Sequence, residues 1–340
     1  MPERPLADRV EQAVAEVLAR LRASARRDRQ LDPGLAPLIA IARELRDLPR
    51  ESFKVRLKSD LERRSFMASV SAKARTPKAR AGRTGSASVH ERAQTVTPYL
   101  VAEDAAALID FVKQVFGGEE VVRSIGSAGG IHCEVRVGDS SLMLGGGGPE
   151  LSWRGQAWPT ALHVYVPDVD AAYRRAVQAG GESSAGPVDQ PYGERSADVK
   201  DAAGNHWYIA TCLEGPYKPE GFDSVMPYLH PLRAEPVINF LKRAFGAEEI
   251  ARYASPDGVI HHAQVRIGTS VIEMGEAHGS YQPMPTMFYV SLPDVDTSYQ
   301  RALEAGATSV SEPANQPYGA RGASVKDVFG NQWYLATPVK

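Results

Sequence analysis

One segment of this sequence occurs twice with few changes. QPYGERSADVKDAAGNHWYIAT at residues 190–211 returns as QPYGARGASVKDVFGNQWYLAT at residues 316–337. Earlier stretches repeat in the same order: TPYLVAEDAAALIDFVKQVFGGEE from Thr97 matches MPYLHPLRAEPVINFLKRAFGAEE from Met226, and IHCEVRVGDSSLML matches HHAQVRIGTSVIEM. A long internal repeat limits the fold more than any local pattern does, because each copy must build the same structural unit. The sequence therefore predicts a duplicated domain.

Each copy alternates strand and helix patterns. Apolar residues recur at helical spacing in DAAALIDFVKQVF and VDAAYRRAVQAG, and at the strand period of two in IHCEVRVG and ALHVYV. We place the first domain at residues 94–214 and the second at residues 215–340. The expected fold class is α+β: two tandem domains, each a pair of βαβββ modules that form a curved mixed sheet around a groove.

The N-terminal region differs from this body. Residues 1–69 show a helical apolar period and predict a small α-helical segment, while residues 70–93 read as a flexible basic linker. Residues 1–93 hold 21 Lys and Arg against 12 Asp and Glu, leaving 18 against 29 for the rest. No DNA-reading or RNA-reading motif accompanies this basic region, so we expect its helices to dock a protein partner rather than nucleic acid.

Composition excludes several classes of protein. The N-terminus carries charges where a signal peptide needs an apolar run, and no window holds the roughly 18 apolar residues of a membrane span. Cys133 and Cys212 are far apart and outside any CxxC arrangement, which argues against a disulfide framework or a zinc knuckle. We therefore expect a cytoplasmic protein without membrane contact.

Several ordered motifs point to one family. The wording PYL, HCEVRVGDSSLML and QPYGERSADVKD, with VPDVD before the second helix and DAAGNHWYIAT at the end, resembles the vicinal oxygen chelate superfamily of glyoxalase I, bleomycin-resistance proteins and extradiol dioxygenases. The closest likeness is to its PhnB-like branch, and it covers residues 94–340. This superfamily includes both enzymes and pure binders, so the fold leaves the function open.

The resemblance also locates the metal-ligand positions. In this chain they are Thr97, Met143, Ala161 and Tyr208 in the first copy, and Met226, Glu273, Met287 and Tyr334 in the second. A divalent metal needs several His, Asp or Glu ligands, and only Glu273 qualifies. We therefore expect no metal cofactor. The alternative is a displaced site of His230, His262 and Glu273 that holds Zn, Ni, Fe or Mn.

Strand alternation predicts what lines the grooves instead. In IHCEVRVG, Cys133 and Val135 share the apolar face, whereas the residues between them share the polar face. Mixed aromatic and polar side chains are the usual lining of a small-molecule site. The predicted ligand-binding residues are Tyr99, His132, Glu134, Arg136, His163, Tyr165, Arg195, Tyr208, Tyr228, His262, Glu273, Tyr289, Arg321 and Tyr334. The same parity adds Asp198, Lys200, His206, His230, Gln264, Arg266, Lys326 and Gln332.

Some of these residues allow two interpretations. Arg195 and Arg321 either clamp a ligand carboxylate or tie their turn to a nearby acidic residue. Glu134 could orient His163 or His206 as a general base. The glycine-rich loop at residues 145–159 is expected to form a flap, whose tryptophans either stack on a ligand or fill a domain junction.

Three functional hypotheses follow. The leading one is metal-independent binding or sequestration of a small organic molecule, with the two domains pairing within one chain or in a homodimer. The alternative is a lyase, isomerase or dioxygenase of the resembled superfamily that uses an off-pattern His and Glu metal site, which leaves open whether the chain is an enzyme. The third is a ligand-sensing regulatory module whose N-terminal helices bind a partner.

Overall fold

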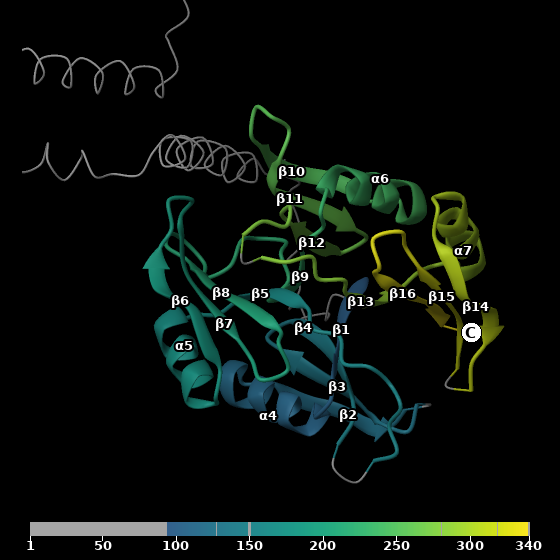
Figure 1. Ribbon diagram of the computed structural model, residues 1–340, viewed down its shortest axis with the longest axis horizontal. Helices are drawn as coiled ribbons and strands as arrows, with labels where there is room; N and C mark the ends of the chain where they lie inside the picture. The colour runs from purple at the N-terminus through teal and green to yellow at the C-terminus, as the bar shows by residue number, and fades with distance from the viewer. Residues whose placement is uncertain (1–93, 127, 149–150, 280, 318, 339–340) are drawn as a thin grey trace, which may run out of the picture. The chain divides into compact units, whose positions relative to one another are not determined.

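The computed structural model describes residues 94–338, apart from residues 127, 149–150, 280 and 318. The helical segment expected over residues 1–69 and the linker over residues 70–93 lie outside the described residues. The described part contains four successive βαβββ modules, as Figure 1 shows.

The modules have these bounds. Module 1 contains β1 (Val96–Ala102), α4 (Ala105–Phe116), β2 (Glu119–Ile125), β3 (Ile131–Val137) and β4 (Ser140–Gly146). Module 2 contains β5 (Ala161–Tyr165), α5 (Val169–Gln178), β6 (Glu182–Asp189), β7 (Glu194–Lys200) and β8 (His206–Cys212). Module 3 contains β9 (Val225–Leu229), α6 (Ala234–Phe245), β10 (Glu248–Ala254), β11 (Ile260–Ile267) and β12 (Ser270–Met274). Module 4 contains β13 (Met287–Ser291), α7 (Val295–Glu304), β14 (Thr308–Asn315), β15 (Ala320–Lys326) and β16 (Gln332–Pro338).

Local sequence signals explain where the helices begin. The side chains of Asp104, Asp168 and Asp294 accept hydrogen bonds from backbone N–H groups in the first turns of α4, α5 and α7. Helix α6 has Arg233 at the capping position, and Glu276 of a later loop accepts from Ala234 N instead. A loop that follows β12 therefore helps to fix the start of α6.

The two sheets each combine modules from both copies. Sheet A has the order β14-β15-β16-β13-β1-β4-β3-β2 and joins module 4 to module 1. Sheet B has the order β10-β11-β12-β9-β5-β8-β7-β6 and joins module 3 to module 2. The joining pairs are antiparallel, with Thr97 opposite Tyr289 and His163 opposite Met226. The expectation that each copy forms its own sheet is wrong, because both sheets cross from one copy to the other.

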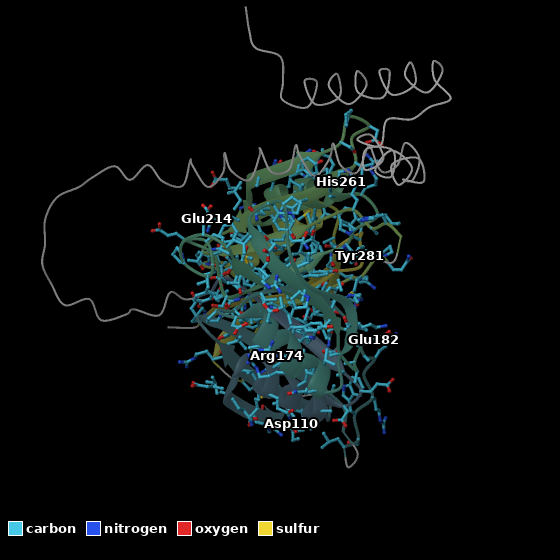
Figure 2. The ribbon with its side chains drawn as sticks, turned by 90° about the vertical axis from the view of Figure 1, so that its left-hand side faces the viewer. Asp110, Arg174, Glu182, Glu214, His261 and Tyr281 are labelled. Carbon is cyan, nitrogen blue, oxygen red and sulfur yellow. The ribbon has the colours of Figure 1, made fainter. Side chains whose placement is uncertain are left out.

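The two large hydrophobic cores, by contrast, largely follow the copies, while a small third core combines Tyr165 and Ala210 with Met226 and Val271. Helix α4 packs beside α5, and α6 beside α7, so that each pair joins the two modules of one copy (Figure 1). Figure 2 labels Asp110 of α4 and Arg174 of α5 on the side of the molecule that carries the first pair. Trp207 and Trp333 are completely buried in these cores, with ring centroids 4.9 Å from Phe116 and Phe245.

None of the described helices is both long and apolar enough to cross a membrane. Each helix covers one face of a sheet with its apolar residues, which leaves the other face of each sheet for polar side chains. We call these opposite faces the polar face of sheet A and the polar face of sheet B.

Candidate functional site

The centre of the polar face of sheet B holds a buried ion pair between the two copies. Glu273 of β12 is 1% exposed, and its Oε2 lies 2.6 Å from Nδ1 of His163 on β5. Gln264 of β11 donates to Glu273 Oε1 at 2.8 Å, and His262 Nε2 lies 4.0 Å from the same oxygen. Burial alone would raise the pKa of Glu273, but the charge and hydrogen bond of His163, with help from His262 and Gln264, lower it to about 2.

A second carboxylate stands on the other side of His163. Glu194 Oε2 of β7 lies 3.9 Å from His163 Nε2, and Tyr165 donates its hydroxyl hydrogen to Glu194 Oε1 at 2.6 Å. Burial, then the charges of Glu194 and Glu273, raise the pKa of Tyr165 well above its ordinary value, so the phenol keeps its proton. His163 thus lies between a carboxylate of its own copy and one of the other copy.

The same face carries a cluster of aromatic rings, with Tyr208 opposite His163 and Tyr228 opposite Glu273 in the strand ladders. Tyr208 of β8 lies with its ring centroid 5.1 Å from Tyr228 of β9, and Tyr281, labelled in Figure 2, stacks 5.4 Å from His230. Tyr208 Oη and His230 Nε2 form a hydrogen bond of 2.7 Å. Burial, with smaller effects of His206 and His278, lowers the pKa of His230 to about 4, so this imidazole is neutral at pH 7. The cluster is aromatic and uncharged, and its three tyrosines are only partly buried.

A third acidic residue borders these rings. Asp198 of β7 is 5% exposed and lies directly opposite Tyr208 in the β7–β8 ladder. Its Oδ1 is 3.4 Å from His206 Nδ1, yet neither atom has a hydrogen-bond partner among residues 94–338 as far as they are described. Burial and then Asp198 raise the pKa of Tyr208. A buried carboxylate oxygen without a donor costs free energy, so this oxygen has unused capacity to accept a hydrogen bond.

The polar face of sheet A repeats this arrangement without counterparts of the three carboxylates of sheet B. Tyr99 Oη and His132 Nδ1 form a hydrogen bond of 2.9 Å, and the Tyr99 and Tyr334 rings lie 6.1 Å apart. Burial and then Tyr334 raise the pKa of Tyr99 to about 12. At the repeat positions of Glu273, His163, Glu194, Asp198 and His206, the other copy has Met143, Tyr289, Ala320, Ser324 and Gln332. The two copies therefore place these three carboxylates on the polar face of sheet B and none of them at the matched positions of sheet A.

Several predicted site residues have other partners. Arg195 pairs with Asp170 and Asp189 at 2.6 and 2.8 Å, and Arg321 pairs with Asp296, so the interpretation that ties the turn to an acidic residue is the one observed. Glu134 accepts a hydrogen bond from Ser141 on sheet A, whereas His163 and His206 lie on sheet B. The suggestion that Glu134 orients either histidine is therefore wrong. Arg136 lies near the end of β3, opposite Ser141.

The donor set does not fit the metal of the resembled superfamily. The eight family positions divide between the sheets: Thr97, Met143, Met287 and Tyr334 on sheet A, and Ala161, Tyr208, Met226 and Glu273 on sheet B. The one carboxylate among them already accepts hydrogen bonds from two side chains. In the described part of the chain, no three His, Cys, Asp or Glu side chains are grouped closely enough to hold a metal ion. The alternative set of His230, His262 and Glu273 is therefore not grouped as a metal site either.

Two further features adjoin the polar faces. A pocket of about 340 Å³ lies at the end of β9, and its lining includes His230, Arg233, Met284, Phe329 and Asn331. In the glycine-rich loop of the first copy, Trp158 N donates to Val101 O, and Lys326 Nζ lies 5.9 Å from the centre of the Trp158 ring. This tryptophan therefore contacts module 4, which belongs to the other copy.

The pairing of His163 with Glu273 is the feature that the sequence alone did not predict. The signal for it was present, because the two copies differ at both positions together, with Tyr289 and Met143 in place of the ionisable pair. A histidine and a glutamate that are both absent from the matched sheet are candidates for one another's partner.

Comparisons with known proteins agree with this architecture. The profile of the Glyoxalase/Bleomycin resistance protein/Dioxygenase superfamily matches residues 93–209 and 233–335. An uncharacterized protein of Mycobacterium bovis is 35% identical over 122 residues, which cover 34% of this chain and 80% of the relative. An uncharacterized protein of Mycobacterium tuberculosis is also 35% identical over 122 residues, covering 34% of this chain and 72% of the relative.

Among solved structures, glyoxalase I from Zea mays is similar with a TM-score of 0.54 and 15% identity, covering 71% of this chain and 92% of that one. A putative dioxygenase from Bacillus subtilis has a TM-score of 0.50 and 13% identity, covering 71% and 84%. At such low identity these likenesses concern the fold alone.

Proposed function

The chain belongs to the Glyoxalase/Bleomycin resistance protein/Dioxygenase superfamily, and from that premise we propose that it binds a small organic molecule on the polar face of sheet B without a metal ion. The observation that carries this proposal is the asymmetry between the two faces. The buried pair of His163 and Glu273, and the Asp198 carboxylate whose Oδ1 forms no hydrogen bond within the described residues, occur on sheet B, while the matched positions of sheet A hold Tyr289, Met143 and Ser324.

Energetics argue that stability does not account for the charged groups. Removing two ions from water costs several kcal/mol each, and apolar replacements of buried ion pairs are often neutral or stabilising. Sheet A has such replacements at both positions in the same fold. Buried charges that the fold does not need are a frequent mark of a functional site.

The shape of the proposed contact follows from burial. His163 and Glu273 are nearly enclosed, whereas Tyr208, Tyr228 and Tyr281 are only partly buried. The ligand therefore contacts the aromatic rings first, and the ionisable pair sets the electrostatic potential beneath it. Tyrosine contributes both apolar area and a hydroxyl, which suits an amphipathic organic molecule.

The remaining expectations belong to the same proposal. We propose that the chain belongs to the PhnB-like branch, because of the sequences of its repeated motifs. We also propose that it acts in the cytoplasm and sequesters its ligand. The binding face includes strands from both copies, so one chain supplies all of it. Any protein partner of the N-terminal helices is a separate question.

A thermal-shift screen of aromatic and amphipathic compounds tests the proposal. Hits should raise the melting temperature in proportion to the logarithm of ligand concentration above Kd and should be recovered unchanged. The shift should shrink in Tyr208→Ala and persist in the matched sheet A variant Tyr334→Ala. A screen without hits, or hits that depend on Tyr334 rather than Tyr208, would refute it.

An enzymatic role is the second candidate, and the position of His163 between Glu273 and Glu194 favours it. An imidazole held by carboxylates can exchange a proton with a bound molecule, as in general acid–base catalysis. Such an enzyme would be a lyase or isomerase that works without the superfamily's metal. Consumption of a screening hit, lost in His163→Gln, would favour this role over sequestration.

A further inference from the structure

The polar face of sheet B carries more negative than positive charge. Its carboxylates are Glu273, Glu194 and Asp198; His163 lies beside the first two, and His206 Nδ1 lies 3.4 Å from Asp198 Oδ1. Lys200, which follows Asp198 on the same face of β7, is exposed to solvent, and His230 is held neutral by burial. Three carboxylates therefore share two neighbouring imidazoles, which leaves this face acidic.

Asp198 has a buried acceptor oxygen that receives no hydrogen bond from the described residues. Its side chain is more than nine-tenths buried, its Oδ1 has no hydrogen-bond partner within the described residues, and the nearby His206 Nδ1 is 3.4 Å away without hydrogen-bond geometry. Buried polar atoms are paired in the great majority of native proteins. The matched residue of sheet A shows the contrast, since Ser324 forms a hydrogen bond of 3.0 Å with Ser311.

Aromatic rings adjoin this carboxylate. Tyr208 lies opposite Asp198 in the strand ladder, and the ring centroids of Tyr228 and Tyr281 lie 5.1 and 6.3 Å from that of Tyr208. The faces of tyrosine rings attract cations, and a carboxylate beside them strengthens the attraction. A cationic donor satisfies both features, whereas an anion would meet three carboxylates.

We infer that the molecule bound on this face carries a protonated amine, which donates to the Asp198 carboxylate and lies against the rings of Tyr208 and its neighbours. This inference rests on the proposed function and adds the charge of the ligand. The partner groups come from both copies, because Asp198 and Tyr208 belong to module 2 and Tyr228 and Tyr281 follow in the second copy.

Matched probes test the charge. Tryptamine and phenethylamine carry the amine, and tryptophol and 2-phenylethanol replace it with a neutral hydroxyl on the same ring. Isothermal titration calorimetry at pH 7 should give at least one amine a Kd about tenfold or more below that of its alcohol, as expected for a charge-assisted hydrogen bond. The corresponding acid, indole-3-acetate, should bind more weakly than either.

Variants assign the preference to one residue. Asp198→Asn and Asp198→Ser, the second of which introduces the residue that sheet A has at this position, should reduce the preference for the amine to less than about threefold. Asp189→Asn removes the same charge from the exposed pair with Arg195 and should leave the preference intact. Circular dichroism and the melting temperature identify any variant that fails to fold.

Each other outcome overturns the inference. Equal binding of amine and alcohol shows that charge is not recognised, although the proposed function survives. A preference that persists in both Asp198 variants places the amine elsewhere. If neither amine binds, the inference is also overturned, while the proposed function stands or falls by the full screen and its dependence on Tyr208.

Discussion

Substituting residues of sheet B by their counterparts from sheet A measures the interaction free energy between His163 and Glu273. The variants are Glu273→Met, His163→Tyr and the double variant, each of which introduces the residue that the other copy already has at that position. The single changes leave one charged group without its partner in a buried place, and each should lower the free energy of unfolding by about 3 to 5 kcal/mol. The double variant should cost much less than the sum.

The magnitude follows from Glu273. The fall of its pKa from 4.5 to about 2 corresponds to about 3 kcal/mol in favour of the carboxylate, most of it due to His163. We therefore expect a coupling free energy of about 3 kcal/mol in the double-mutant cycle. Urea denaturation at pH 7, followed by the fluorescence of the buried Trp207 and Trp333, provides the assay.

A carboxylate on sheet A provides the control. Glu134 is half-buried and accepts one hydrogen bond from Ser141, so Glu134→Gln should cost less than about 1 kcal/mol. Single variants whose effects simply add, with coupling below about 0.5 kcal/mol, would refute the reasoning. Such additivity would mean that His163 and Glu273 are neighbours without a strong interaction.

Three further predictions concern acid stability, the arginine pairs and the glycine-rich loop. Because the pKa of Glu273 in the folded protein lies below its usual value, the contribution of its carboxylate to stability is complete above about pH 4.5 and is lost as the pH falls toward 2. The difference in unfolding free energy between the wild type and Glu273→Gln should therefore narrow from pH 7 to pH 3. A difference that stays constant with pH would contradict the assignment. Arg195→Ala removes exposed ion pairs outside the polar face, so it should cost about 1 kcal/mol or less and leave ligand affinity unchanged, as a titration of the best screening hit would show. Gly146 has a φ of 133°, and an added Cβ would lie 1.8 Å from Ala102 O, so Gly146→Ala should cost more than about 2 kcal/mol, whereas Gly148→Ala, whose Cβ meets Leu151 Cδ1 at 3.4 Å, should change stability by less than about 1 kcal/mol; equal denaturation midpoints for the two variants would count against this account.

The sequence predicted the modules and their faces well. Strand parity placed Cys133 and Val135 on the apolar face and His163 and Tyr208 among the polar-face residues, as observed. This success has a simple cause, because the side-chain period of a strand follows from its backbone geometry. The repeat likewise predicted the number and order of the elements.

The pairing of modules was not predictable from these patterns. Strands β1 and β9 have similar sequences, so the alternation of apolar and polar residues does not show which of the two strands pairs with β5. As a consequence, the ion pair between His163 and Glu273, 110 residues apart, could not be foreseen from either copy by itself. The role of Arg195 and Arg321 could not be predicted for another reason. An arginine that pairs with a nearby acidic residue and an arginine that binds a ligand carboxylate can occur in the same turn sequence.

The central claim is that the polar face of sheet B, and not its counterpart on sheet A, binds a small organic molecule. A crystal structure of the protein with the tightest hit of the screen tests this claim most directly. We predict electron density for the ligand against Tyr208 and Tyr228, beside Asp198. Density against Tyr99 and Tyr334 on sheet A, or in the pocket beside Phe329 and Asn331, would contradict it.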